Sequence, residues 1–580
     1  MTIGSTTAHE VFADLTATLT DGEAVVPAIA VRKALTENDW RRTAVVYQVY
    51  PRSFADSDGD GIGDLPGVTQ RLDALADLGV DAVWLSPFYT SPQADAGYDV
   101  ADYRNVDPVF GILADFDALL EKAHKLGLKV IVDLVPNHSS DEHPWFQAAL
   151  ASGPGSPERA RYIFRDGRGE NGELPPNNWE SCFRGPAWTR TTNPDGTPGE
   201  WYLHLFDTKQ PDWDWENPEV RAEFLSVLTF WLDRGADGFR VDVAHALIKA
   251  PGLPDSDPRV DAGPDADPEG FFQTGPMWDQ DRVHEVYRSW RALLDGYTPD
   301  RMLVAEAWVQ PLSRLARYVR EDEMHQAFNF DYLETEWDAA ALRRTIDTSM
   351  AANEVVGAPT TWVLSNHDVV RHASRLGLGT DGPRPNGIRA NDPQPDHELG
   401  LRRARAASLT MLGLPGSAYL YQGEELGLPD HTSLDDDLRQ DPTWWRSQYT
   451  EAGRDGCRVP LPWEGDAPGL GFGPTDATWL PQPAEYAELA RDKQVGVDGS
   501  TLEMYQSALA LRRAFRLGAG SVEWTAGLPA GVIGYRNGEV TVVANMGTGP
   551  VPMPTGEVLM TSADLPDHAA LLPDVTVWLV

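Results

Sequence analysis

The feature that most constrains this chain is an eightfold alternation of short apolar runs and longer amphipathic stretches. The runs, rich in Val, Ile, Leu and aromatic residues, begin at Ala44, Ala82, Lys129, Gly238, Met302, Ala327, Thr361 and Ser417. The stretches at 65–79, 116–127 and 223–235 have helical periodicity and end at a glycine, which commonly caps a helix. Strands that alternate with helices in this way predict a parallel (β/α)8 TIM barrel, an α/β fold.

Interruptions of the alternation predict the domain organisation. Residues 1–38 show no strong period and are treated as an N-terminal extension without an assigned role. A long stretch rich in Gly, Pro, Asn and Trp follows the third strand and indicates an inserted small domain at 139–205. The barrel then comprises 39–138 and 206–516. Short strand-like runs in 517–580 predict a C-terminal antiparallel β-sandwich.

Polar and ionisable residues lie at the ends of several predicted strands. They are Asn137 and His138 after the third, Arg240 and Asp242 in the fourth, Glu306 in the fifth, and His367 and Asp368 after the seventh. In a parallel barrel the C-terminal strand ends form one face, which carries the active site. Side chains from four strands are therefore expected to converge there.

Charge and composition exclude several classes of function. The chain has 88 Asp and Glu against 48 Lys and Arg, a formal net charge of -40, which would repel nucleic acid and anionic lipid. It contains no apolar run of about 20 residues, as a membrane-spanning helix requires. The N-terminus does not resemble a secretory signal, and Cys182 and Cys457 do not form a disulfide framework. We therefore expect a cytoplasmic protein acting on a neutral small molecule.

The strand-end residues belong to sequence blocks that occur in a fixed order. The blocks are GDGIGDLPG, DLVPNH, QPD, GFRVD, VAEAW, SNHD and GEELG. From about Trp40 to the end, the chain resembles the α-amylase family of glycoside hydrolases, and within it the oligo-1,6-glucosidases and maltase-type α-glucosidases. The resemblance implies that Asp242 is the nucleophile and Glu306 the proton donor of a retaining mechanism. In such enzymes the two carboxyl groups are about 5 Å apart. Arg240, two residues before Asp242, would keep that carboxylate ionised.

The same resemblance assigns residues around the sugar ring. Asp368 is implied as a third carboxylate that binds ring hydroxyls, and His138 and His367 as hydrogen-bond donors to them. Tyr98 would stack beneath the ring.

Closure of the pocket decides whether an enzyme of this kind cuts chain ends or interiors. In the glucosidases that this chain resembles, a carboxylate before a Gly-Tyr pair forms an ion pair with an Arg of a later loop. Asp95 and Arg458 stand at these positions and predict a closed, exo-acting site. The alternative is a surface salt bridge, which would contribute little.

An acidic loop after the first strand predicts a metal site. Carboxylates alternate with glycines at Asp56, Asp58, Asp60 and Asp64, a spacing similar to the start of an EF-hand loop. Hard oxygen ligands suit Ca2+, and the resemblance adds the carbonyl of Ile62. The alternative is an acidic loop that binds no metal.

The resemblance implies an exo-acting α-glucosidase that takes short α-glucosides and needs no organic cofactor. Val243, directly after the nucleophile, favours α-1,6 linkages, whereas the overall likeness to maltase-type enzymes favours α-1,4 linkages. Because an acceptor sugar can replace water, a transglucosylase or sugar isomerase is a second reading. A non-catalytic interaction subunit is a third, but all three carboxylates are retained.

Overall fold

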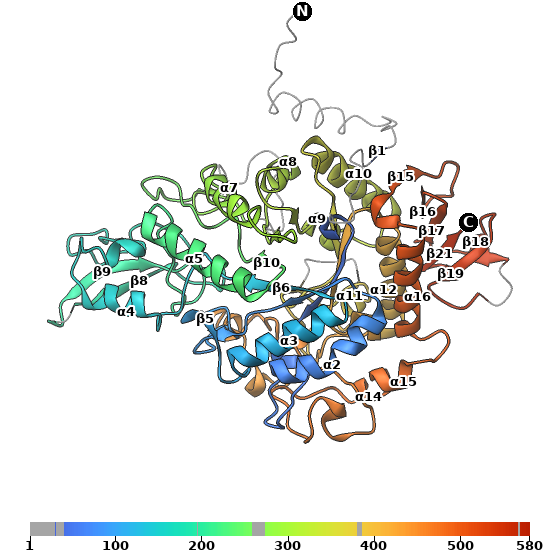
Figure 1. The fold of residues 1–580 in the computed structure, drawn as a ribbon, viewed down its shortest axis with the longest axis horizontal. Helices are drawn as coiled ribbons and strands as arrows, with labels where there is room; N and C mark the ends of the chain where they lie inside the picture. The colour runs from blue at the N-terminus through green and yellow to red at the C-terminus, as the bar shows by residue number, and fades with distance from the viewer. Residues whose placement is uncertain (1–28, 31–39, 194, 258–272, 380–384, 566–568) are drawn as a thin grey trace, which may run out of the picture.

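Eight parallel strands form the centre of the protein (Figure 1). A computed structural model describes residues 29–30, 40–193, 195–257, 273–379, 385–565 and 569–580. The strands are hydrogen-bonded in the order β12-β11-β10-β6-β3-β2-β14-β13, which confirms the predicted (β/α)8 barrel. Their bounds are β2 (Val45–Val49), β3 (Ala82–Leu85), β6 (Lys129–Leu134), β10 (Gly238–Val241), β11 (Met302–Ala305), β12 (Gln326–Ala327), β13 (Thr361–Val363) and β14 (Ser417–Tyr421).

Helices cover the outside of these strands. The longer ones are α2 (Leu65–Leu78), α3 (Leu113–Lys125), α5 (Pro218–Arg234), α7 (Val283–Leu294), α10 (Ala339–Val355), α12 (His397–Leu412) and α16 (Thr501–Ala514). Gly79 and Gly235 end α2 and α5 in the left-handed conformation, with φ of 96° and 115°. Side chains other than glycine rarely adopt this conformation, so the two glycines end these helices where the sequence predicts.

The sixth predicted strand is mostly wrong. The run from Ala327 continues β12 for a single residue, and α9 (Phe330–Glu334) begins three residues later. The side-chain oxygen of Asn329 accepts a hydrogen bond of 3.1 Å from the backbone N–H of Tyr332. This N-cap satisfies an amide that the first helical turn leaves free, so it favours a helix over a longer strand.

The chain between β6 and α5 forms a small inserted region, at the left of Figure 1. It contains α4 (Pro144–Ala151) and an antiparallel sheet of β7 (Phe164–Arg165), β9 (Pro198–Leu203) and β8 (Trp188–Thr192). Asp212, near the end of this region, forms a buried ion pair of 2.9 Å with Lys249 after β10. This ion pair joins the end of the insertion to the barrel.

The C-terminal region is an antiparallel β domain, at the right of Figure 1. Its six-stranded sheet contains β1 (Ile29–Ala30), β15 (Ser521–Trp524), β16 (Val532–Asn537), β17 (Val540–Asn545), β21 (Val575–Leu579) and β19 (Val558–Thr561). A second sheet of only two short strands, β18 (Val551–Pro552) and β20 (Ala570–Leu571), shares a buried apolar cluster with it. The expected sandwich therefore has one very small layer. β1 pairs with β15, so two residues of the N-terminal extension complete the larger sheet.

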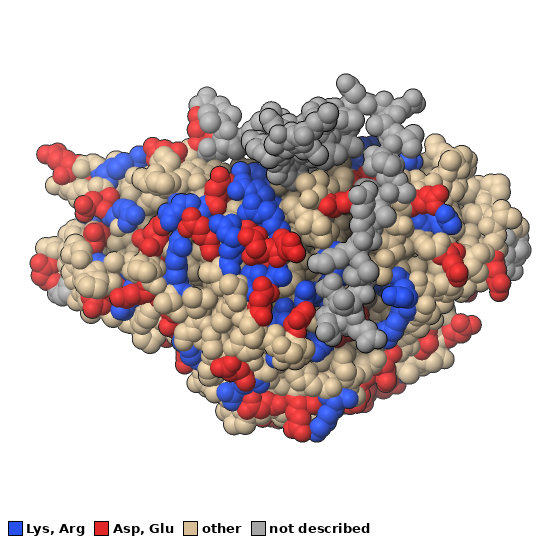
Figure 2. Space-filling model, turned by 45° about the horizontal axis from the view of Figure 1, so that its top comes forward, with Lys and Arg blue, Asp and Glu red and all other residues tan. Residues whose placement is uncertain are grey.

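The surface carries both signs of charge despite the acidic composition. Figure 2 shows acidic and basic side chains interspersed over one face of the molecule. Among the described residues, none of the helices is long and apolar enough to cross a lipid bilayer.

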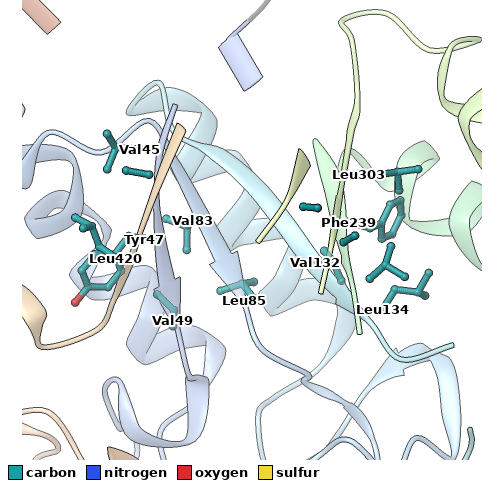
Figure 3. Packing of buried hydrophobic residues seen from close by; sticks show 14 of the residues in the cluster. Val45, Tyr47, Val49, Val83, Leu85, Val132, Leu134, Phe239, Leu303 and Leu420 are labelled. Atoms are coloured by element: carbon teal, nitrogen blue, oxygen red, sulfur yellow. The ribbon is translucent and has the colours of Figure 1, made fainter. Parts of the chain in front are cut away.

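Side chains of the barrel strands alternate between two apolar clusters. Val83, Val132 and Phe239 belong to the large cluster of Figure 3, which the strands share with the surrounding helices. Trp84 and Ile131, each one residue away from such a position, belong to a separate cluster inside the barrel. Because neighbouring residues of a strand point to opposite faces, every second residue of β10 points inward.

Candidate active site

Four charged side chains meet inside the barrel at the C-terminal ends of three adjacent strands. Arg240 on β10 is in register with Asp133 on β6 and with Val304 on β11. Asp242 and Glu306 each follow two residues later, so they lie on the same face and at the same level. Because neighbouring strands are about 4.8 Å apart, the two carboxyl groups face each other across one strand spacing.

Arg240 connects three carboxyl groups. Its Nη1 atom is 2.5 Å from Oδ1 of Asp242 and 3.0 Å from Oδ1 of Asp133, and its Nη2 atom is 3.5 Å from Oε2 of Glu306. The guanidinium is 1% exposed, so water screens these contacts little. The predicted contact between Arg240 and Asp242 is thus present. The role of Asp133 is one that the sequence reasoning missed.

The two facing carboxyls compete for one positive charge. Burial raises the pKa of both Asp242 and Glu306, and Arg240 opposes that shift in each case. One cation faces several carboxyl groups, which favours a shared proton among them. Asp242 makes the shorter contact with Arg240, so we assign the negative charge to Asp242 and the proton to Glu306.

A different set of charged groups determines the pKa of Asp368. Burial alone would raise the pKa of this carboxyl, but Arg454 and Arg458, each 3.0 Å from Oδ1, hold it below its usual range. His367 is nearby, but burial lowers the pKa of its imidazole well below 6.5, so the guanidinium groups supply the positive charge. Asp368 is therefore ionised at neutral pH.

The predicted partner of Asp95 is wrong. Nη2 of Arg454, not of Arg458, lies 2.7 Å from Oδ1 of Asp95. The sequence RDGCR begins and ends with arginine, and the 3-10 turn at Asp455–Cys457 separates the two side chains. Arg454 lines the pocket, whereas Arg458 is 2% exposed and donates from Nε to the backbone oxygen of His367. Arg458 thus supports Asp368 from behind.

His367 stands behind Tyr98 and does not line the pocket wall. The two rings are stacked with centroids 5.2 Å apart at 10°. The His367 Nδ1 atom is 2.7 Å from the Gln48 amide nitrogen, and Nε2 is 2.5 Å from the Tyr98 hydroxyl. His367 is fully buried and is not among the residues that line the pocket, so its expected donation to a sugar hydroxyl stays a prediction. It positions Tyr98, which lines the pocket.

His138 does line the pocket. Its Nε2 atom is 3.1 Å from the backbone oxygen of Tyr98 and 3.2 Å from the side-chain nitrogen of Gln210. Burial lowers the pKa of this imidazole to about 4, so it is neutral at physiological pH. A neutral ring suits a hydrogen-bonding role toward an uncharged ligand.

Many of these side chains surround one pocket. The pocket has a volume of about 140 Å³ and is partly open to solvent. The lining residues are Asp95, Tyr98, His138, Phe183, Phe206, Asp242, Val243, Gln273, Glu306, Trp308, Asp368 and Arg454. The sequence reasoning did not assign Phe183, Phe206, Gln273, Trp308 or Arg454 to the site. For Trp308, its position two residues after Glu306 was an available signal.

The acidic loop places three of its four carboxylates together. Asp56, Asp58 and Asp64 each offer an oxygen within 4.8 Å of the others, whereas Asp60 is outside this group. Both oxygens of Asp56 also accept backbone N–H groups of the loop, and Asp64 caps α2. The loop thus fits a hard cation with fewer side-chain ligands than predicted.

Comparison with known proteins gives consistent matches. Residues 48–517 match the alpha amylase catalytic domain. An oligo-1,6-glucosidase of Parageobacillus thermoglucosidasius is 36% identical over 508 residues, which cover 82% of this chain and 84% of the relative. A probable alpha-glucosidase of Rhizobium meliloti is 38% identical over 494 residues, 82% of this chain and 83% of the relative.

The fold has the same kind of match among solved structures. The crystal structure of an alpha-glucosyl transfer enzyme, XgtA, superposes with a TM-score of 0.79 at 35% sequence identity. The match covers 93% of this chain and 99% of that one.

Proposed function

The chain belongs to the α-amylase family of glycoside hydrolases, and we propose that it is a retaining α-glucosidase that removes terminal glucose from short α-glucosides. The observation that carries this proposal is the arrangement of Asp242 and Glu306 on adjacent strands beside one guanidinium. One strand spacing is close to the roughly 5 Å that separates the carboxyl groups of retaining enzymes.

The geometry supports a two-step reaction. In the first step a carboxylate oxygen of Asp242 bonds to the anomeric carbon, the glycosidic C–O bond breaks, and Glu306 gives its proton to the leaving oxygen. In the second step water attacks the same carbon and transfers a proton to Glu306. The ester bond to Asp242 breaks and its electron pair returns to the carboxylate. Glucose leaves with its original configuration.

The ion pair between Asp95 and Arg454 supports exo action. Both residues line the pocket, and Arg454 also contacts Asp368 and Asp441, so three ion pairs hold the wall in place. A fixed, charged wall leaves room for a chain end, whereas the interior of a polysaccharide needs a cleft open at both sides. The pair is buried, so it is not the weak surface salt bridge of the alternative reading.

Two linkage preferences remain candidates. Val243 lines the pocket directly after the nucleophile and favours α-1,6 bonds, as does the similarity to an oligo-1,6-glucosidase. The similarity to a probable alpha-glucosidase and the overall likeness to maltase-type enzymes favour α-1,4 bonds, to which we give preference. Initial rates on maltose, isomaltose, sucrose, trehalose and maltotriose separate the two.

Transfer to an acceptor sugar is the second candidate activity. The similarity to a named alpha-glucosyl transfer enzyme favours it, because both activities share the glucosyl-enzyme intermediate. Product analysis at high substrate concentration distinguishes them. Free glucose supports hydrolysis, whereas accumulating oligosaccharides or a sugar isomer support transfer or isomerisation.

The direct test of the proposal is glucose release by the purified protein from a chromogenic α-glucoside. Starch serves as the second substrate, and we expect its viscosity to fall slowly relative to the glucose released. A rapid fall would indicate an open cleft and endo action. No release from any α-glucoside would overturn the proposed activity.

We also propose that Asp56, Asp58 and Asp64 hold a structural Ca2+. Added Ca2+ should raise the midpoint of thermal unfolding of chelator-treated protein, since a bound ion stabilises the folded state. Asp58→Asn should abolish the increase. Asp60→Asn is the matched control, because Asp60 is outside the group of three. An unchanged midpoint with millimolar Ca2+ would contradict the proposal.

A further inference from the structure

Trp308 contacts the proton donor directly. Its indole Nε1–H donates a hydrogen bond of 2.8 Å to Oε1 of Glu306, two residues earlier. The indole lines the pocket and stacks on the ring of Phe330, with centroids 3.8 Å apart and planes at 1°. Phe330 is 2% exposed at the start of α9, so it holds the indole plane against a rigid part of the barrel.

The other oxygen of Glu306 is also engaged. The backbone N–H of Val243 donates to Oε2 at 2.6 Å. Val243 has a positive φ of 43°, a conformation that β-branched residues rarely adopt. Both oxygens of Glu306 therefore accept hydrogen bonds from N–H groups that can only donate.

Two donors of this kind stabilise the carboxylate relative to the protonated acid. Burial acts in the opposite direction and raises the pKa of Glu306. The two halves of a retaining cycle need opposite forms of this residue, because it donates a proton in the first step and accepts one in the second. Burial and the two N–H donors thus shift the pKa of Glu306 in opposite directions, and each step of the cycle needs one of these shifts.

We propose that Trp308 is a positioning residue whose indole N–H holds Glu306 in the ionised, proton-accepting form needed to hydrolyse the glucosyl-enzyme. This inference rests on the proposed retaining function. Burial favours the proton that the first step needs, and the indole favours its absence in the second step. The role of Trp308 can be tested more directly than that of Val243, because a side-chain donor can be removed without a change of backbone.

Trp308→Phe removes the N–H and keeps a ring that can stack on Phe330. With an aryl α-glucoside whose leaving group needs no protonation, the second step should limit the rate. We expect kcat to fall by about tenfold or more, the loss of one hydrogen bond to a charged group. KM should fall by a similar factor, so that kcat/KM changes little. The mass spectrum of the intact protein should show a covalently bound glucosyl group during turnover.

The pH profile provides an independent readout. The substrate for this readout is maltose, whose leaving group needs the proton of Glu306. Loss of the donor should raise the pKa of Glu306, so the basic limb of kcat/KM for maltose should move to higher pH. Phe330→Leu keeps the N–H but loosens the indole, and should shift both readouts by less in the same direction. Trp337→Phe is the matched control, because its indole also donates to a carboxylate, at 2.8 Å to Asp574 in the C-terminal β domain.

The possible failures are distinguishable. A fall in kcat at constant KM, with the basic limb unmoved and no covalent species, would assign Trp308 a merely structural role and overturn the inference. Wild-type protein that releases no glucose from any α-glucoside would instead overturn the proposed function.

Discussion

At the scale of single residues, the site depends on which arginines form ion pairs with which carboxyl groups. Arg240 forms ion pairs with Asp133, Asp242 and Glu306 inside the barrel. Arg454 and Arg458, in the segment after β14, form ion pairs with Asp368. Each carboxyl has a different share of positive charge, as the proposed roles of nucleophile and proton donor require.

Replacement of the nucleophile should abolish most of the activity. Asp242→Asn keeps the size of the side chain but cannot form the ester, so turnover of a chromogenic α-glucoside should fall by roughly five powers of ten, about 7 kcal/mol of barrier. Circular dichroism checks that the variant is folded. Near-normal turnover would remove Asp242 from the nucleophile role.

Arg454 should matter for binding of the terminal sugar. Arg454→Ala leaves Asp95 and Asp368 without their shared cation, and we expect KM for maltose to rise roughly 10–100-fold, the effect of one lost charged contact. Arg184→Ala is the control, because Arg184 forms a largely exposed ion pair with Glu451. Equal effects of the two substitutions would argue against the closed wall.

The partner of Asp95 shows where prediction from sequence stops. Asp95 and the arginine-containing loop that reaches it were both predictable, because each belongs to a recognisable sequence block. Which of two arginines, four residues apart, reaches Asp95 depends on one turn at Asp455–Cys457. Phe183 and Phe206 were unpredictable for a related reason, since their approach to the pocket depends on how the insertion packs on the barrel.

At the scale of elements, the parallel register of β10 and β11 brings the two catalytic carboxyls to one level. Helix ends marked by Gly79 and Gly235 were predictable, because a left-handed residue at that position favours glycine. Helix α9 was not predictable from the sequence, because the apolar run that contains it fits a strand equally well. The N-cap Asn329 decides the outcome and places Phe330 beneath Trp308.

The ion pair between Lys249 and Asp212 should stabilise the junction of insertion and barrel. Lys249→Met leaves a buried carboxylate without its cation, and we expect the free energy of unfolding to fall by about 3 kcal/mol or more. Lys209→Met removes a more exposed pair with Asp141 and should cost less than about 1 kcal/mol. Denaturant titration measures both, and similar losses would contradict this account.

At the scale of the whole molecule, the net charge of -40 coexists with a pocket proposed to bind neutral sugars. Most acidic residues take no part in the site, and Figure 2 shows them mixed with basic ones on one face. The overall charge therefore reflects the surface, whereas the buried arginines set the charge balance of the pocket.

A buried carboxyl outside the pocket predicts how stability depends on pH. Burial raises the pKa of Glu424 to about 8, while the backbone N–H of Tyr421 opposes the shift. A group whose pKa is raised by folding stabilises the folded state while protonated. Its contribution should therefore be lost as pH rises from about 4.5 to about 8, at up to roughly 1.4 kcal/mol per pH unit.

Glu424→Gln removes this ionisation and should flatten the loss over the same range, as measured by denaturant titration at pH 5, 7 and 8. Glu488→Gln, at an exposed position, is the control and should follow the wild type. Parallel curves for wild type and Glu424→Gln would show that Glu424 does not titrate in this range.

The central claim is that Asp242 and Glu306 act from opposite sides of one anomeric carbon through a covalent intermediate. The most direct test is to follow the anomer of glucose first released from an α-glucoside by proton NMR, before mutarotation. The account predicts α-glucose, from two successive inversions. Initial release of β-glucose would show a single displacement and contradict it.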